Sequence, residues 1–352
     1  MQQPLVTIII PVYNLAPYLP RCIASLLQQT YSRLELIFIN DGATDDSLEV
    51  LQSWQQHPQI KIISQDNAGP GPARNTGLDH AQGDYVLFVD GDDWIAPETV
   101  ARCVEAAQAH AADIVCFGFR KVYQQKDTLV EAEPWIYEPA AFSGSDYIIS
   151  FFSEATHRKD KLNTSTCGKF YLRSFIEAHQ LRFRQATFED SPFFLEAVYA
   201  ARHIHCLADT FYAYFIQEKD TTRQSVTSTQ INDRKITSFY HAEALMKKFL
   251  LSKNIFEKYR HYYYAYHNAR ILQYGGYMDI YVTDTPPQAA AWQIFMAQLQ
   301  HHRRDLTMDR KGLYRGYRKR IVALNIGAAI SRVSAPMAHR FFRWYEKTMA
   351  PK

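Results

Sequence analysis

The fold of this chain is decided by the stretch Gly83-Asp84-Tyr85-Val86-Leu87-Phe88-Val89-Asp90-Gly91-Asp92-Asp93-Trp94. Its apolar run from Tyr85 to Val89 is rich in β-branched and aromatic residues, which is typical of a strand buried on both faces, as in a parallel sheet. Three carboxylates follow where this strand would leave the sheet. Because ligands of open α/β sheets bind outside the carboxyl ends of the strands, the stretch predicts a ligand site at these acids.

The three carboxylates of Asp90, Asp92 and Asp93 repel one another unless they are solvated, protonated or bridged by a cation. Mg²⁺ and Mn²⁺ take carboxylate oxygens and leave coordination sites open for phosphate oxygens. One hypothesis is therefore a divalent metal, Mn²⁺ or Mg²⁺, that is bound through Asp92, is assisted by Asp90 or Asp93, and grips a diphosphate. The alternative is a solvated acidic turn.

The composition is that of a globular protein of one large domain or two. The chain has 352 residues, of which 47% are hydrophobic, and its five cysteines form no C-x-x-C pair. The cysteines therefore indicate free thiols in a reducing compartment.

We expect no signal peptide and no spanning helix, since no run approaches the ~18 apolar residues that a membrane helix needs. His203 and His205 form an H-x-H, but we find no Cys or carboxylate set that completes a zinc site. A cytoplasmic protein is the resulting prediction.

The net charge of +3 hides an asymmetry along the chain. Residues 301–352 carry 13 Lys and Arg against 3 Asp and Glu, which leaves 26 basic and 33 acidic residues in the rest. An acidic body argues against nucleic acid as a partner.

Apolar runs alternate with helical patterns from residue 6 to residue 119. This order predicts an α/β fold with a mostly parallel sheet and right-handed crossovers. No G-x-G-x-x-G follows the first strand and the chain has no G-x-x-x-x-G-K-[ST], which disfavours a dinucleotide dehydrogenase and a P-loop enzyme. The strands are expected at residues 6–12, 34–39, 60–64, 85–89 and 113–119, and the helices near residues 19–27, 46–55, 73–81 and 97–110.

The pattern changes beyond residue 119. We expect helices over Gly144–Glu154 and Lys169–His179, and short strands over Ile204–Leu207 and Phe211–Ile216. Another helix should begin at Glu189-Asp190-Ser191-Pro192, with Asp190 as a candidate N-cap. From Asn232 the chain reads as mainly helical. We therefore divide it into a catalytic domain over residues 1–228 and a helical C-terminal region over residues 229–352.

Five stretches together resemble the family 2 glycosyltransferases, which are inverting nucleotide-sugar enzymes of the GT-A fold. They cover about residues 4 to 225, and each is weak alone. In order, they are Ile8-Ile9-Ile10-Pro11-Val12-Tyr13-Asn14, Ile39-Asn40-Asp41-Gly42-Ala43-Thr44-Asp45, Asn67-Ala68-Gly69-Pro70-Gly71-Pro72-Ala73-Arg74-Asn75-Thr76-Gly77, Phe88-Val89-Asp90-Gly91-Asp92-Asp93-Trp94 and Phe188-Glu189-Asp190-Ser191-Pro192-Phe193. The departures, such as Asn40 where an Asp is common and Gly91 where a Ser is frequent, remove no chemically active group.

The resemblance implies a role for each of these stretches. It makes Asp190, preceded by Glu189, the catalytic base, and Asp90 to Asp93 the metal and diphosphate site, with Asp92 and Asp93 on the metal. It also implies nucleotide contacts, with Asp41 at the base or ribose and Arg74 near the base. The other residues assigned to the nucleotide are Pro11, Tyr13, Asp90 and Gly91.

Each assignment has a structural alternative. Asp190 has the alternative of an N-cap, Asp41 that of a turn residue before Gly42, and Arg74 that of a surface salt bridge. Trp94 either closes over the sugar or packs under the next helix. Lys169 is expected at the surface, with a phosphate contact as the less favoured reading.

The last third has no motif that we recognise. Its stripe of Tyr259, Tyr262, Tyr263 and Tyr266 at helical spacing is more often core than a sugar platform. The basic, amphipathic tail from Arg303 to Lys352 is compatible with an anionic membrane surface, which a lipid-linked acceptor at the inner face of the plasma membrane would explain. A solvated face or an oligomer contact are the alternatives.

These expectations converge on a metal-dependent, inverting glycosyltransferase. It would move a sugar from a nucleotide-diphosphate sugar, with UDP weakly favoured by Asp41, to a hydroxyl of a glycan or lipid-linked saccharide in polysaccharide synthesis. A sugar nucleotidyltransferase and a non-catalytic nucleotide or glycan binder are the rival classes.

Overall fold

A computed structural model describes residues 3–125, 128–153, 159–184, 187–216 and 233–280, together with residues 326, 329, 330, 337, 340, 341 and 344. The chain divides into two compact units. The first consists of Met1–Ile148 and Asn163–Arg223, and the second of Ile149–Leu162 and Gln224–Lys352. Our expected boundary at residues 228 and 229 lies outside the described residues and stays a prediction.

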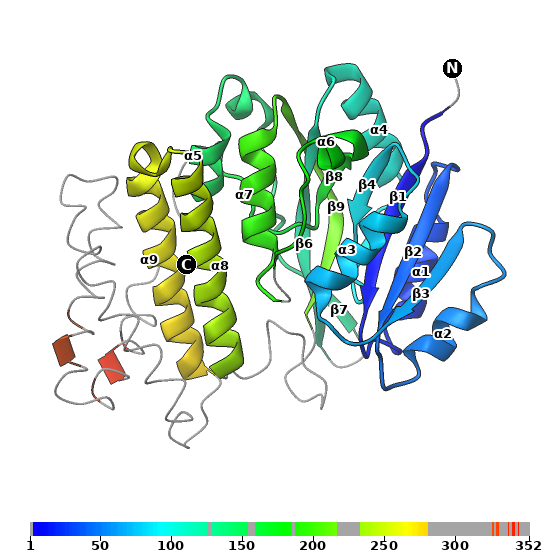
Figure 1. Cartoon of the computed structure of the whole chain (residues 1–352). Helices are drawn as coiled ribbons and strands as arrows, with labels where there is room; N and C mark the ends of the chain where they lie inside the picture. Colours follow the sequence, from blue (N-terminus) through cyan, green and yellow to red (C-terminus); the bar gives the residue numbers. More distant parts are fainter. Residues whose placement is uncertain are drawn as a thin grey trace. The chain divides into compact units, whose positions relative to one another are not determined.

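Four parallel strands form one half of the sheet in the first unit (Figure 1). β1 (Val6–Val12) pairs with β2 (Leu34–Asp41) and with β4 (Tyr85–Phe88), and β2 pairs with β3 (Ile60–Gln65). Every residue of β1 and β4 is buried, as the continuous apolar runs predicted. The parallel register brings the carboxyl ends of β1, β2 and β4 to one edge of the sheet.

The other half of the sheet is mixed and contains both parallel and antiparallel pairs. β8 (Lys169–Leu172) lies antiparallel between β4 and β6 (Ile114–Gln125), and β6 pairs in parallel with β9 (Ile204–Ile216). The short strand β5 (Trp94–Ile95) pairs with β9, and β7 (Thr128–Glu131) pairs with β6. Within the described residues the strand order is β3-β2-β1-β4-β8-β6-β9-β5.

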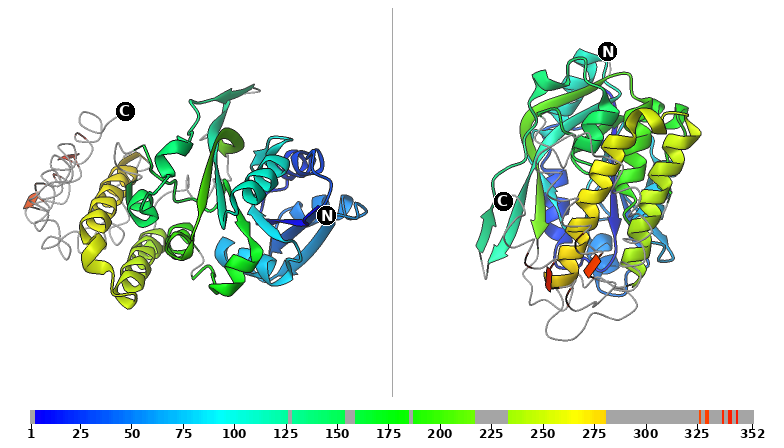
Figure 2. Two further views of the ribbon diagram at one scale, coloured as in Figure 1. Left: turned by 90° about the horizontal axis from the view of Figure 1, so that it is seen from above. Right: turned by 90° about the vertical axis from the view of Figure 1, so that its left-hand side faces the viewer.

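Helices cover both faces of this sheet, as the view from above shows (Figure 2). One face carries α1 (Leu19–Leu27), α2 (Ser47–Ser53) and α4 (Thr99–His110), whose apolar residues pack with the even-numbered residues of β1 and β2. On the other face, Ala73 of α3 (Pro70–His80) packs on Ile37 and Ile39. α3 lies so close to β1 that a Cβ on Gly77 would come within 2.3 Å of Ile9.

Beyond residue 119, two sequence-based expectations were wrong and a third had the right type of element but the wrong bounds. The predicted helix over Lys169–His179 is strand β8 followed by α6 (Arg173–Ala178). The two short strands predicted near residues 204 and 216 are one strand, β9, with an irregularity in its pairing to β6. The helix predicted from Gly144 is the shorter α5 (Tyr147–Phe152), preceded by the 3₁₀ helix Pro139–Phe142.

The second unit is built around α8 (Asp233–Ser252) and α9 (Phe256–Ile280), which lie side by side in Figures 1 and 2. Tyr263 and Tyr266 are buried, and their rings lie against those of Phe151 and Phe152. The interpretation of the tyrosine stripe as core is therefore confirmed for these two residues. Most of the basic tail from Arg303 lies outside the described residues.

Among the residues that the structure describes, no helix is both long enough and apolar enough to cross a membrane.

Candidate active site

The candidate site lies where the first unit's parallel strands end. β4 ends at Phe88, and Asp90, Asp92 and Asp93 follow within five residues. β2 ends in Asp41, and Tyr13 follows β1 directly. The acids therefore stand at the carboxyl edge of the sheet, as predicted from the stretch around β4.

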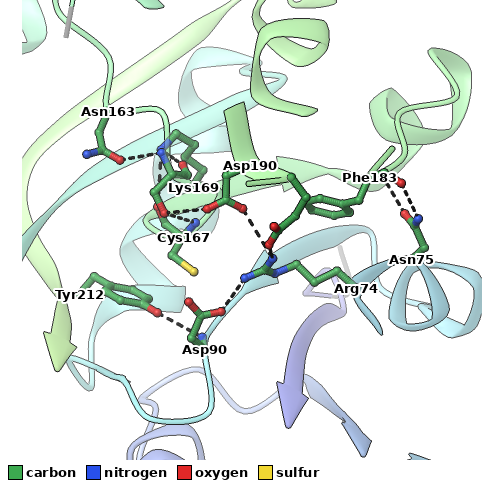
Figure 3. A network of polar contacts seen from close by, with 11 residues as sticks. Arg74, Asn75, Asp90, Asn163, Cys167, Lys169, Phe183, Asp190 and Tyr212 are labelled. Carbon is green, nitrogen blue, oxygen red and sulfur yellow. Dashed lines mark hydrogen bonds and ion pairs between the residues drawn. The ribbon is translucent and has the colours of Figure 1, made fainter. Parts of the chain in front are cut away.

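Arg74 is the centre of a buried ion network (Figure 3). Its side chain, on α3, is only 3% exposed. One guanidinium nitrogen, Nη2, lies 2.6 Å from Oδ1 of Asp90, and the other, Nη1, is paired with Glu189 and lies 3.6 Å from Oδ1 of Asp190. A single guanidinium thus joins the acid after β4 to the acid pair at the start of α7 (Asp190–Ala200).

An aromatic ring lies against the guanidinium. Its carbon lies 5.5 Å from the ring centre of Phe183, and that ring stacks on Phe193 of α7. The backbone of Phe183 is fixed in turn by two hydrogen bonds with the side-chain amide of Asn75, which follows Arg74 in α3. Arg74 is therefore a rigid, buried cation, and the alternative of a surface salt bridge is wrong.

The acid pair enters α7 in an unusual backbone conformation. Phe188, directly before Glu189, has a φ of 56°, in the left-handed region that few residues with a bulky side chain adopt. Glu189 is the N-cap residue and Asp190 is the first helical residue, and no side chain caps the helix. Asp190 is therefore not the N-cap residue, as the alternative proposed, but the residue after it. The Asp190 carboxylate is directed at Arg74 instead.

Asp92 is a half-buried carboxyl with a raised proton affinity. Burial, together with the neighbouring charge of Asp90, raises the pKa of Asp92 to about 7. Neighbouring like charges disfavour ionisation of both carboxyl groups at once. A divalent ion would remove this penalty, so the donor set of Asp90 and Asp92 fits a hard, oxygen-preferring metal such as Mn²⁺ or Mg²⁺.

Asp93 faces the sheet rather than its edge. It is fully buried, Oδ2 accepts a hydrogen bond of 2.5 Å from the Tyr212 hydroxyl, and Oδ1 accepts one of 2.7 Å from the backbone N–H of Phe215. The Tyr212 oxygen in turn accepts a bond from the N–H of Asp90. This geometry argues against our prediction of Asp93 as a metal ligand, because both of its oxygens are used to fix the acidic turn to β9.

Trp94 lies in a stack with Arg21 and Phe215. The guanidinium carbon of Arg21 is 4.0 Å from the Trp94 ring centre and 4.2 Å from that of Phe215. Arg21 also donates a hydrogen bond of 3.1 Å to the carbonyl oxygen of Asp92. These contacts favour packing beneath the turn as the role of Trp94, and they give Arg21 a positioning role for Asp92.

The Asp41 carboxylate is occupied by donors of its own chain. It is 2% exposed and accepts bonds from the Gln65 side chain and from the N–H groups of Ala68 and Gly69. These bonds shape the loop that leads into α3 and Arg74. The assignment of Asp41 to the nucleotide base stays a prediction. Its observed contacts give it a role in holding this loop.

The other assigned nucleotide contacts differ in their accessibility. Tyr13 is 47% exposed at the end of β1, so its ring is available to a ligand. Pro11 is buried within β1. The space beside Gly91 is tight, since a Cβ there would lie 2.9 Å from Cδ1 of Leu15 and 3.3 Å from the Pro11 carbonyl oxygen.

The structure corrects the predicted position of Lys169. It was expected at the surface, but it is fully buried at the start of β8. Its ammonium group donates to the backbone carbonyl oxygens of Ser165 and Cys167 and lies 4.5 Å from the Phe194 ring centre. Lys169 therefore holds the segment before β8 beside Asp190, whose Oδ2 lies 3.5 Å from the Ser165 hydroxyl (Figure 3).

Residues 7–179 match the family model described as glycosyl transferase family 2. The chain belongs to this family. Its family 2 motifs are the ones that supply Arg74 and the acidic turn after β4.

Two curated relatives extend the comparison. EpsJ of Bacillus subtilis, an uncharacterized glycosyltransferase, is 33% identical over 221 residues, which are 60% of this chain and 61% of EpsJ. Chondroitin synthase of Escherichia coli is 43% identical over 103 residues, 29% of this chain and 15% of that protein. The match to EpsJ therefore spans about three fifths of each protein.

Among solved structures, S. aureus TarS residues 1–349 in complex with UDP-GlcNAc superpose with a TM-score of 0.55. The alignment covers 97% of this chain and 91% of TarS at 18% identity. The family 2 chain thus has the GT-A fold, as the resemblance implied.

Sequence reasoning missed two residues that shape the site, Tyr212 and Arg21. Tyr212 lies in an aromatic run of β9 that indicates only a strand, and Arg21 lies on an amphipathic helix. Neither position carries a local signal, because its partner, Asp93 or Trp94, is more than 70 residues away in the chain.

Proposed function

We propose that this family 2 protein is an inverting glycosyltransferase that uses a nucleotide-diphosphate sugar. The observation that carries the proposal is the convergence of Asp90, Glu189 and Asp190 on the buried guanidinium of Arg74. It joins a metal-binding turn at the carboxyl edge of the sheet to a carboxylate that can act as a base. Family membership supports the reaction class.

Asp190 is the proposed general base. An acceptor hydroxyl is a poor nucleophile, so a carboxylate must take its proton as it attacks the anomeric carbon. Asp190 is 30% exposed, whereas Glu189 beside it is 8% exposed and paired with Arg74. Glu189 and Arg74 therefore orient Asp190, and Asp190 alone faces solvent enough to meet an acceptor. One base and direct displacement give inversion of the anomeric configuration.

Asp92 is the proposed main metal ligand, with Asp90 assisting. The departing nucleoside diphosphate gains negative charge, and a divalent ion bound there would stabilise it as a Lewis acid. Tyr212 and Arg21 keep the turn in place through Asp93 and the Asp92 carbonyl oxygen. The chain's own contribution is thus an acidic turn that is tied to β9 and α1 and carries the carboxylates of Asp90 and Asp92.

The donor proposed first is a UDP-sugar. The TarS structure with the same fold contains UDP-GlcNAc, and this supports a uridine nucleotide without deciding it. For the acceptor we propose a hydroxyl of a glycan or a lipid-linked saccharide in polysaccharide synthesis, which is supported by the 43% identity to a chondroitin synthase over 103 residues. Association of the basic tail with an anionic membrane at the inner face of the plasma membrane completes the proposal and rests on charge alone.

A screen of nucleotide sugars with Mn²⁺, read as release of nucleoside diphosphate, tests this proposal. We expect turnover of at least one UDP-sugar that stops with a chelator and returns with Mn²⁺. Asp92→Ala should abolish this activity, because the metal loses its main ligand. The matched control is Asp79→Ala, an exposed acid of α3 whose partner is the surface residue Arg182, and it should keep full activity.

The rival classes give different results in the same assay. Pyrophosphate release from a nucleoside triphosphate and a sugar 1-phosphate would identify a nucleotidyltransferase. Binding of nucleotide sugars without turnover of any of them would indicate a binding protein. Full activity of Asp92→Ala would contradict the metal assignment.

A further inference from the structure

Three histidines from two distant segments meet on the first unit, away from the acidic turn. His110, His203 and His205 each offer a ring nitrogen, and within the described part of the chain these are the three metal-ligand candidates that lie together, with all ligand atoms within 4.8 Å of one another. The rings of His110 and His205 stack with centres 3.8 Å apart. The sequence analysis set the H-x-H aside because it lacked a further ligand, and His110 is that ligand.

The backbone that carries these side chains is tied together. His110 is the last residue of α4, and Ala111 follows in the left-handed conformation with a φ of 46°. The Asp113 carboxylate then accepts bonds from the N–H groups of Arg202 and His203, at 2.7 and 3.1 Å, while the Asp113 N–H donates to the His203 carbonyl oxygen. The turn after α4 and the entry to β9 are thus held in one arrangement.

The third histidine is fixed by the sheet. His205 belongs to β9 and stands opposite Val115 in the parallel pairing with β6. His203 and His205 are half-buried and His110 is exposed, so the outermost ring has the most freedom to move. Two of the three ligands therefore start from fixed positions, and one can adjust to complete a site.

The chemistry of three imidazoles selects the kind of ion. Neutral imidazole suits Zn²⁺, Cu²⁺ and Ni²⁺, whereas Mg²⁺ and Mn²⁺ prefer oxygen ligands. Zn–N bonds of about 2.0–2.1 Å in a tetrahedron place ligand nitrogens roughly 3.3 Å apart, so modest ring rotations close the observed spacing. Burial and the two neighbouring imidazoles lower the pKa of His205, which favours the neutral, metal-binding form.

We propose that His110, His203 and His205 bind a zinc-class transition metal ion, with water as the remaining ligand. The bound ion would join the C-terminal end of α4 to the start of β9. Such a link stabilises the folded unit, because the ion binds the folded chain and the three ligands are far apart in the sequence.

This site is independent of the proposed catalytic metal. His205 lies near the start of β9, and Tyr212, which holds the acidic turn, lies seven residues further along the same strand. At ~3.3 Å per residue a strand covers roughly 23 Å over seven residues. The two sites also differ in preference, since the carboxylates favour Mn²⁺ and the imidazoles favour Zn²⁺. Failure of one proposal therefore leaves the other standing.

Equilibrium binding of Zn²⁺ to full-length protein without a histidine tag tests the site. We expect one Zn²⁺ bound at the histidines with a raised melting temperature, whereas any Mn²⁺ binding should be unchanged by the histidine substitutions. Removing the hydrogen-bond partner of a metal-binding histidine typically lowers the metal affinity about 10–100-fold. Removing the histidine itself, as in His203→Asn or His110→Asn, should lower the Zn²⁺ affinity at least as much. The triple variant His110→Asn, His203→Asn, His205→Asn should lose both the binding and the thermal shift.

The control variant is His57→Asn, which removes an exposed histidine that stacks on Trp54 elsewhere in the same unit. It should bind Zn²⁺ like the unmodified protein, and Asp92→Ala should do the same. If the folded triple variant binds Zn²⁺ as tightly as the unmodified chain, or if the unmodified chain binds none, the proposal is overturned. His110→Asn keeps the test valid even if the triple variant does not fold, since its side chain is exposed.

Discussion

Asp190→Asn should lower the rate of sugar transfer by about 10²–10⁴-fold, the usual contribution of a positioned general base. The amide has the shape of the carboxyl group but cannot take the acceptor's proton. Binding of the donor should change little, because Asp92 and Asp90 stay intact. The measurement is kcat for nucleoside diphosphate release in the presence of acceptor, with donor affinity determined separately by titration.

The matched control is Glu196→Gln, which neutralises an acid on the same helix α7. Glu196 pairs with Arg184 near the surface, at 3.1 Å, and has no contact with Arg74. It should keep the transfer rate of the unmodified enzyme. If Asp190→Asn transfers sugar as fast as Glu196→Gln, another group is the base and the assignment of Asp190 is wrong.

Arg74→Met should destabilise the first unit by about 3–5 kcal/mol, the typical cost of removing one partner of a buried ion pair. The methionine fills most of the volume but leaves Glu189, which is 8% exposed, without its cation beside Asp90 and Asp190. Burial and the charge of Asp190 already raise the pKa of Glu189, and Arg74 opposes that rise. The measurement is the free energy of unfolding from denaturant titration.

Adding Glu189→Gln to the Arg74→Met variant should restore part of the lost stability, because the buried charge that lost its partner is then absent. The two changes are in direct contact, so their effects should be strongly non-additive. Arg120→Met serves as the control, since its pair with Glu131 is exposed and typically contributes about 0–1 kcal/mol. Equal losses for Arg74→Met and Arg120→Met would contradict the central place of Arg74 in the network.

The parallel half of the fold was readable from the sequence because its signals are local. Every residue of β1 and β4, and every residue of β2 except Glu35, is buried, so apolar runs between turn residues marked these strands. The acids that follow β4 sit at a strand end by chain connectivity alone. Position in the chain therefore placed Asp90 and Asp92 correctly at the edge of the sheet.

The half of the sheet with mixed strand directions could not be predicted from the sequence, because the hydrophobic periodicity of its short elements is ambiguous. The run Lys169–Leu172 is four residues long and merges with the helical pattern of α6, so the two were predicted as one helix. The buried position of Lys169 depends on carbonyl oxygens of Ser165 and Cys167 and on the ring of Phe194, none of which a propensity argument reveals.

The sequence analysis predicted the residues of the candidate site but not the contacts between them. The motifs named Arg74, Asp90, Glu189 and Asp190, yet the chain separates Arg74 from Glu189 by 115 positions, and no local pattern shows that they pair. The same holds for Asp93, a predicted metal ligand whose hydrogen bonds with Tyr212 and Phe215 of β9 no local pattern shows. Long-range pairing decides which carboxylates remain available for chemistry.

A crystal structure of the enzyme with Mn²⁺ and a nucleoside diphosphate, with the ion located by anomalous scattering, tests the central claim most directly. The acidic turn after β4 and the acid at the start of α7 should form one site around Arg74. We predict the Mn²⁺ peak at coordination distance from the Asp92 carboxylate, bridged to the diphosphate, with Asp190 open to the acceptor side. An ion bound without Asp92, or a diphosphate bound away from this turn, would contradict the account.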